Sequence, residues 1–205
     1  MSPSLTVLRR AVNVTGAVSP RLAGALAMRV FLDPRPRLAV RPDEESTMSA
    51  AKRDTLTVRG IPITTYEWGS GDTTVLLVHG WRGRAAQFAP IVRDLVSEGL
   101  HVVAFDAPGH GASPGVRTDI RDWVEAIETL QLQHGRFSVV VGHSFGSVAA
   151  VSAVRSGTAA ARVMTIAGGP SLRIFPDTYS RTVAQLPPRV HADFDRRFHA
   201  VLGAD

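Results

Sequence analysis

The 205-residue sequence contains no cysteine, which excludes a disulfide framework and any chemistry that depends on a thiol. It also lacks an apolar run long enough to cross a membrane, because the apolar stretch 22–32 is short and contains Arg29. The N-terminal segment does not show the charged, apolar and cleavage-site order of a signal peptide. We therefore predict a cytoplasmic protein.

Excess positive charge is missing from most of the chain. Residues 1–53 contain nine Lys or Arg and four Asp or Glu, whereas residues 54–205 contain 14 of each kind. A neutral main domain argues against nucleic-acid binding. The basic N-terminal segment has two interpretations, a weak contact with an anionic membrane surface and a solvated amphipathic helix packed on the domain. We favour the packed helix.

The periodicity of the apolar residues predicts strands that alternate with helices. Residues 4–14 and 20–32 have helical patterns, with Leu22, Leu26, Met28 and Val30 as an apolar side, and 33–53 has the composition of a polar linker. Strands are predicted at 55–60, 61–68, 75–79, 101–105, 138–141 and 162–167, the last four of them buried, and further helices at 85–98, 119–134, 147–156 and 190–202. The first two strands would form a hairpin, and Thr118 would cap the helix that follows it. This alternation predicts an α/β fold with a mostly parallel, doubly wound sheet.

The sequence Gly142-His143-Ser144-Phe145-Gly146 lies between a predicted buried strand and a helix. In that context the G-x-S-x-G pattern is typical of a nucleophile elbow, in which the serine occupies a sharp, strained turn. The N–H group of Phe145 would open the helix and point toward an oxyanion. The alternative is an ordinary strand-to-helix loop with a capping serine.

Two further loops follow buried strands. In His79-Gly80-Trp81-Arg82-Gly83 the glycines allow the N–H group of Trp81 to face the same point as that of Phe145, which would complete an oxyanion hole. The alternative is a plain turn at the end of a strand. In the loop 106–113, we expect Asp106 and His110 to have a structural role through local hydrogen bonds.

These three motifs, in this order, resemble those of the α/β-hydrolase superfamily, in particular its serine esterases and lipases. The resemblance covers residues 55–170 and implies Ser144 as nucleophile, with the amides of Trp81 and Phe145 as oxyanion donors. It implies hydrolysis of a small ester-type substrate, and no cofactor or metal is expected. Residues 171–205 resemble the start of a helical cap, so the predicted division is 1–54 (helical leader and linker), 55–170 (core) and 171–205 (cap).

The sequence departs from the family pattern after Ser144. The family places an acid and then a histidine on loops that follow later strands. Here the remaining candidates lie outside any predicted strand: Asp177, Asp193, Asp195 and Asp205, with His191 and His199. Asp177 with His191, or Asp193 with His199, would satisfy the order alone. We therefore expect a chain truncated within the cap, without its acid and base, and the alternative function is an inactive remnant or a binding protein.

The same truncation predicts an exposed edge. Residues 162–167 would be an internal strand in the family's complete sheet, and without later neighbours they would present an unpaired apolar edge. Such edges recruit other chains. Self-association is therefore expected.

Overall fold

The computed structural model describes residues 3–168 and 174–202, and the chain divides into two compact units. The larger unit is Pro34–Gly169, and the smaller one combines Met1–Asp33 with Pro170–Asp205. The functional division into leader, core and cap stays a prediction.

The larger unit is built on one sheet, whose described strands follow the order β1-β2-β4-β3-β5-β6. The strands are β1 (Lys52–Val58), β2 (Ile61–Trp68), β3 (Thr74–Val78), β4 (His101–Phe105), β5 (Phe137–His143) and β6 (Ala160–Ile166). β1 and β2 form the predicted antiparallel hairpin, and β2 also pairs antiparallel with β4. The remaining pairs are parallel, which confirms the predicted mostly parallel α/β sheet.

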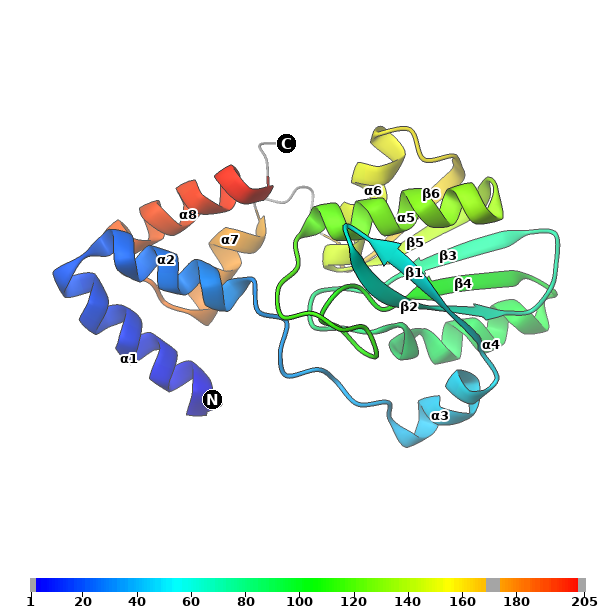
Figure 1. Cartoon of the computed structure of the whole chain (residues 1–205), viewed down its shortest axis with the longest axis horizontal. Coiled ribbons are helices and arrows are strands. Elements are labelled where there is room, and N and C mark those ends of the chain that lie inside the picture. Colours follow the sequence, from blue (N-terminus) through cyan, green and yellow to red (C-terminus); the bar gives the residue numbers. More distant parts are fainter. Residues whose placement is uncertain (1–2, 169–173, 203–205) are drawn as a thin grey trace. The chain divides into compact units, whose positions relative to one another are not determined.

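Helices cover both faces of this sheet. α5 (Ile120–His134) and α6 (Phe145–Arg155) lie on one face, and α4 (Ala89–Ser97), preceded by the 3-10 turn η1 (Ala85–Phe88), lies on the other (Figure 1). β3 is buried along its whole length, as its continuous run of apolar residues predicts. β3 therefore lies inside the core, between β4 and β5, and it leads into the loop 79–83 that contains Trp81 (the Trp81 loop).

The start of α5 differs from the prediction by one residue. Asp119, and not Thr118, is the N-cap, and its side chain accepts a hydrogen bond from the Arg121 N–H group. The Thr118 hydroxyl instead donates to Asp122 at 2.7 Å. A carboxylate at the cap also interacts favourably with the positive end of the helix dipole, which explains why it takes the position.

The predicted polar linker 33–53 contains a helix, α3 (Pro42–Ser49), so that prediction was wrong in part. The backbone N–H of Arg41 donates to Glu44 at 2.9 Å, and proline at the first helical position favours the start. Met48 is buried in the core of the larger unit. The cap, the buried Met48 and the hydrogen bonds that Thr47 accepts from Trp68 and Arg93 hold this segment, although it is polar on average.

β6 is less buried than predicted. It pairs with β5 on one side and is the outermost described strand, and Met164 is 56% exposed. The apolar run at 162–167 predicts a buried strand, but an outer strand has fewer neighbours to cover it. The expected exposed edge is present in the described sheet.

The smaller unit consists of helices. They are α1 (Pro3–Val18), α2 (Pro20–Phe31), α7 (Ile174–Thr178), the π-helical turn η2 (Tyr179–Val183) and α8 (Pro188–Leu202). Phe31 contacts Phe194 and Phe198 edge to face, with ring centroids 5.6 and 5.7 Å apart. Such edge-to-face pairs add to the stabilisation from burial alone.

The buried side of α2 differs from the predicted one. Met28 is buried as expected, but Leu22 is 64% exposed. The helix instead buries small residues, and a Cβ atom on Gly24 would lie 2.4 Å from Asp193 Oδ2 of α8. Small side chains allow two helices to approach closely, which favours this face over the leucine face. Among the helices in the described ranges, none is long and apolar enough to cross a membrane.

Candidate active site

Ser144 occupies the turn between β5 and α6. Its backbone has φ 52° and ψ −118°, a positive φ that is strained for a residue with a side chain. Two backbone hydrogen bonds hold this turn: the Ser144 N–H donates to Ile166 O at 2.8 Å, and the Ser147 N–H donates to Ser144 O at 3.0 Å. A strained serine at the carboxyl end of a parallel strand is the geometry of a nucleophile elbow.

Close backbone approach explains the glycine two residues after the serine. A Cβ atom on Gly146 would lie 2.2 Å from Val78 O and 2.5 Å from His79 O. Only glycine therefore lets the start of α6 pack against the end of β3. This packing places the elbow beside the loop that follows β3.

The Trp81 loop lies directly beside Ser144. A Cβ atom on Gly80 would be 3.0 Å from the Ser144 Cβ atom, and the Gly83 N–H closes the turn onto Gly80 O at 2.9 Å. The rings of Trp81 and Phe145 are in edge contact, with centroids 5.4 Å apart. The structure thus brings all three predicted site residues together.

His79 is a structural residue of this loop. Its Nε2 atom accepts a hydrogen bond from the Ala107 N–H at 3.0 Å, so Nδ1 carries the proton and donates to Gly80 O at 2.7 Å. Burial lowers the pKa of His79 to about 4. A neutral imidazole with both nitrogens bonded to the backbone does not act as a general base.

His110 follows the same pattern. Its Nε2 atom accepts from the Arg82 N–H, and its Nδ1 atom lies 3.0 Å from Pro108 O, to which it donates. Burial lowers the pKa of His110 to about 3, and the neighbouring His79 lowers it further. His110 therefore links the loop after β4 to the Trp81 loop.

Asp106 connects the segment after the Trp81 loop with the loop that follows β4. Its carboxylate accepts hydrogen bonds from the Tyr66 hydroxyl at 2.9 Å and from the N–H groups of Ala85 at 2.7 Å and Ala112 at 2.8 Å. Arg84 lies 3.8 Å away as counter-charge, and Asp106 is fully buried. Burial, and then the Asp106 charge, raises the pKa of Tyr66. These contacts agree with the predicted structural role of Asp106 and His110.

A pocket of about 300 Å³ adjoins the elbow. It includes His143, which precedes Ser144, and Ile166, whose carbonyl accepts from the Ser144 N–H. Its other lining residues are Arg41, Gln87, Phe88 and Ile91. This pocket offers a small, mixed polar and apolar space that borders the G-x-S-x-G turn at His143.

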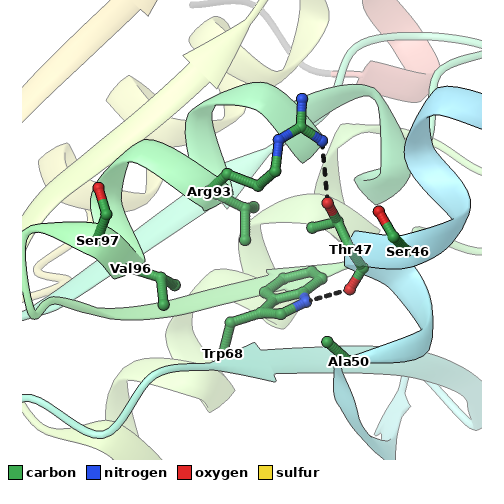
Figure 2. Close-up of a pocket in the computed structure, with 8 residues that line it drawn as sticks. Ser46, Thr47, Ala50, Trp68, Arg93, Val96 and Ser97 are labelled. Carbon is green, nitrogen blue, oxygen red and sulfur yellow. Dashed lines mark hydrogen bonds between the residues drawn. The ribbon is translucent and has the colours of Figure 1, made fainter.

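A second pocket, of about 360 Å³, lies between α3 and α4 and over Trp68 (Figure 2). The Trp68 indole N–H donates to Thr47 O at 2.7 Å, and Arg93 donates to the Thr47 hydroxyl at 3.0 Å. Ser144, Trp81 and Phe145 are not among its lining residues. We assign no chemistry to this pocket.

The candidate acids and bases after Ser144 belong to the smaller unit. Residues 145–168 contain no histidine and no acidic residue. Asp177 and His191 do meet, with 3.6 Å between the Asp177 Oδ1 and His191 Nε2 atoms. The other candidate pair, Asp193 with His199, does not meet in the described structure, because each residue forms an ion pair with a different partner.

Each member of that second pair has other partners. Asp193 binds Arg196 at 2.8 Å and Arg197 at 2.6 Å, and His199 lies 3.5 Å from Asp195, one turn earlier on the same helix. Asp205 lies outside the described residues. The structure also shows a contact that the sequence did not predict, 2.6 Å between the Ser180 Oγ and His191 Nδ1 atoms. The irregular turn that contains Ser180 has no sequence signal that would have revealed it.

Comparison with known proteins agrees with this geometry. The model of the alpha/beta hydrolase family matches residues 75–204. A pimeloyl-(acyl-carrier protein) methyl ester esterase of Shewanella woodyi is 30% identical over 136 residues, which are 66% of this chain and 50% of that protein. A monoacylglycerol lipase of Mycolicibacterium smegmatis is 32% identical over 80 residues, 35% of this chain and 29% of the lipase.

Solved structures show the same fold. An esterase of Pyrococcus furiosus superposes with a TM-score of 0.59 at 21% identity, over 78% of this chain and 67% of that chain. The present chain spans about half the length of the methyl ester esterase and less than a third of the lipase. The family model covers more than half of the present chain, including the elbow and the strands around it. The chain therefore belongs to the alpha/beta hydrolase family.

Proposed function

We propose that this chain is a serine hydrolase whose nucleophile is Ser144 and whose substrate is a small ester. The strained backbone of Ser144, at φ 52°, is the observation that carries the proposal. An ester is favoured because the similar proteins include a methyl ester esterase and a monoacylglycerol lipase.

The chemistry is acyl transfer to water. The Ser144 Oγ atom attacks the ester carbonyl carbon, and the carbonyl oxygen becomes an oxyanion that the N–H groups of Trp81 and Phe145 stabilise. The carbon–oxygen bond to the alcohol then breaks, the alcohol leaves with a proton, and an acyl-enzyme remains. Water hydrolyses the acyl-enzyme in the second half of the reaction.

We further propose that the chain lacks a working acid and base for this serine. The larger unit contains no acidic residue or histidine after Ser144, and His79 and His110 bond to the backbone through both ring nitrogens. Acylation would then depend on a reactive ester, and deacylation would be slow. We expect the hydrolysis rate to exceed the rate in water by about 10³-fold, which is what an oxyanion hole and substrate binding supply without a complete triad.

The test is acyl-enzyme formation with p-nitrophenyl acetate. We expect at most one equivalent of p-nitrophenol per chain in a burst, and a matching acetyl adduct in the intact mass. Ser144→Ala should show neither, and Ser152→Ala on the same helix should behave like wild type. An adduct that persists in Ser144→Ala would contradict the nucleophile. Rapid multiple turnover abolished by Ser144→Ala would instead contradict the missing base.

The second candidate is a non-catalytic binding protein with a hydrolase fold. The absence of acids and histidines from 145–168 favours it. The two candidates separate on the burst, because a binding protein without a reactive Ser144 forms no acetyl adduct.

Two further contacts are proposed from exposed apolar side chains. On α1, Val7, Val14 and Val18 are 69%, 66% and 84% exposed. These side chains are available for the less favoured interpretation of the N-terminal segment, a weak contact with an anionic membrane surface. Flotation of the full chain with anionic vesicles tests this contact, and binding unaffected by salt or no binding would contradict it.

The outer position of β6 favours self-association, and sedimentation as a stable monomer would contradict that.

A further inference from the structure

Three side chains that are distant in sequence meet at one end of the sheet, the end opposite to the elbow. Glu67 lies near the end of β2, His101 begins β4, and His134 ends α5. One potential ligand atom from each residue lies within 4.8 Å of the other two. His101 begins a parallel strand, whereas Ser144 follows the end of one, so this cluster is separate from the site described above.

The two histidine rings are held in a defined arrangement. Their centroids are 5.4 Å apart, with an angle of 59° between the planes. The His101 Nε2 atom lies 3.2 Å from Glu67 Oε2, and the His101 Nδ1 atom lies 3.3 Å from the Thr74 hydroxyl. Without an ion, Nε2–H can donate to the Glu67 carboxylate. An ion bound at Nε2 would replace this proton, and the proton would then lie on Nδ1 with the Thr74 hydroxyl as its acceptor. Such a hydrogen bond to the outer nitrogen is common in metal-binding histidines.

All three side chains are partly exposed, so an ion and its water can reach them. Lys52 is the competing cation, because its Nζ atom lies 3.3 Å from Glu67 Oε1. The other oxygen of the same carboxylate faces His101.

We propose that Glu67, His101 and His134 bind a divalent transition-metal ion, with Zn²⁺ as the test ion. Two neutral imidazoles and one carboxylate form a ligand set that Zn²⁺ accepts, with water in the fourth position. Bonds of about 2.0–2.2 Å in a tetrahedral site need ligand atoms about 3.4 Å apart. The Glu67 and His101 atoms, 3.2 Å apart, are close to this spacing, and the proposal requires the His134 nitrogen to move from within 4.8 Å of them to about 3.4 Å. The ion would join β2, β4 and α5.

The test is calorimetric titration of the full chain, free of any histidine tag, with zinc chloride at pH 7.5. We expect one ion per chain and a rise in the melting temperature on saturation. His134→Asn and Glu67→Gln should each weaken binding at least about tenfold, since even outer partners of a ligand are worth that much. Thr74→Val should weaken it less. Circular dichroism checks that each variant is folded.

Two controls separate a built site from chance binding. His199→Asn removes another histidine that lies near one carboxylate, and it should leave the affinity unchanged. Lys52→Gln removes the competing cation from an exposed position and should tighten binding. No zinc binding by the wild type would overturn the proposal, and so would binding that survives both His134→Asn and Glu67→Gln. Neither outcome depends on whether Ser144 is reactive.

Discussion

Two serines of this chain lie in contrasting surroundings. Ser144 has the strained backbone of an elbow, and its side chain makes no capping hydrogen bond to the helix α6 that it precedes. Ser180 lies in the turn η2, fully buried, with His191 Nδ1 at 2.6 Å and Asp177 beyond the opposite ring nitrogen. One serine therefore has the backbone geometry of a nucleophile, and the other has the side-chain partners.

The comparison separates two requirements of serine catalysis. An elbow presents the hydroxyl and the oxyanion donors, whereas a base raises the reactivity of the hydroxyl. Ser180 is inaccessible and has no elbow, so we attribute its contacts to packing of the smaller unit. In our proposal Ser144 meets the first requirement and lacks the second.

The largest expected effect is on the loops beside Ser144. Asp106→Ala leaves three donors without their acceptor and the buried Arg84 without its counter-charge. Breaking a buried network of this kind costs about 5 kcal/mol in the free energy of unfolding. Urea denaturation measures it, with Asp54→Ala at an exposed position as control. A loss below about 1 kcal/mol would contradict the anchoring role.

The next effect concerns the packing of α6 against β3. Gly146→Ala places a Cβ atom 2.2 Å from a backbone carbonyl that cannot rotate away. We expect a loss of about 4 kcal/mol, above the usual range for overpacking because the clash is with backbone. Ser152→Ala in the same helix should change stability by less than about 0.5 kcal/mol. An unchanged urea midpoint for Gly146→Ala would show that the elbow tolerates a wider approach.

A smaller effect is expected from acid. The pKa of His79 is about 4 in the folded chain, below the 6.5 of a free histidine, so the unfolded chain takes up a proton first as the pH falls. Stability from this residue is complete above about pH 6.5 and is lost toward pH 4, on the order of 3 kcal/mol in total. Melting temperatures between pH 7.5 and 4 measure the loss. The curve of His79→Asn should be shallower than that of wild type, and a parallel curve would contradict the assignment to His79.

The smallest effect sharpens the comparison itself. In Ser144→Cys the thiol ionises far more readily than a hydroxyl and depends less on a base, so acylation by p-nitrophenyl acetate should be at least about tenfold faster than in wild type. The natural chain has no cysteine, so the signal comes from this position alone. A slower reaction than wild type would indicate that a working base already serves Ser144.

The sequence predicted the sheet and the elbow well because both rest on local patterns. The buried strands, the hairpin at Gly60 and the strand–serine–helix order all follow from short apolar runs and glycine positions. The sequence-based prediction was wrong for features that depend on tertiary contacts. The exposure of β6 depends on its outer position, and the helix α3 depends on a buried methionine.

Contacts between distant residues were beyond such patterns. Glu67, His101 and His134 are more than 30 residues apart from one to the next, and each alone is an ordinary strand-end or helix-end residue. The sheet register and the end of α5 bring them together. His191 likewise meets Ser180 only through an irregular turn. Sites built across elements need the fold before they can be recognised.

The most direct test of the account is to locate the serine that reacts with a fluorophosphonate. The full chain is treated with the probe, digested, and the modified peptide is identified by mass spectrometry. We predict a slowly formed adduct on Ser144, of at most one per chain, because its backbone presents the hydroxyl, no base is proposed to assist it, and Ser180 is buried. An adduct on Ser180, or none on a folded chain, would contradict the claim that the elbow of Ser144 is the reactive centre.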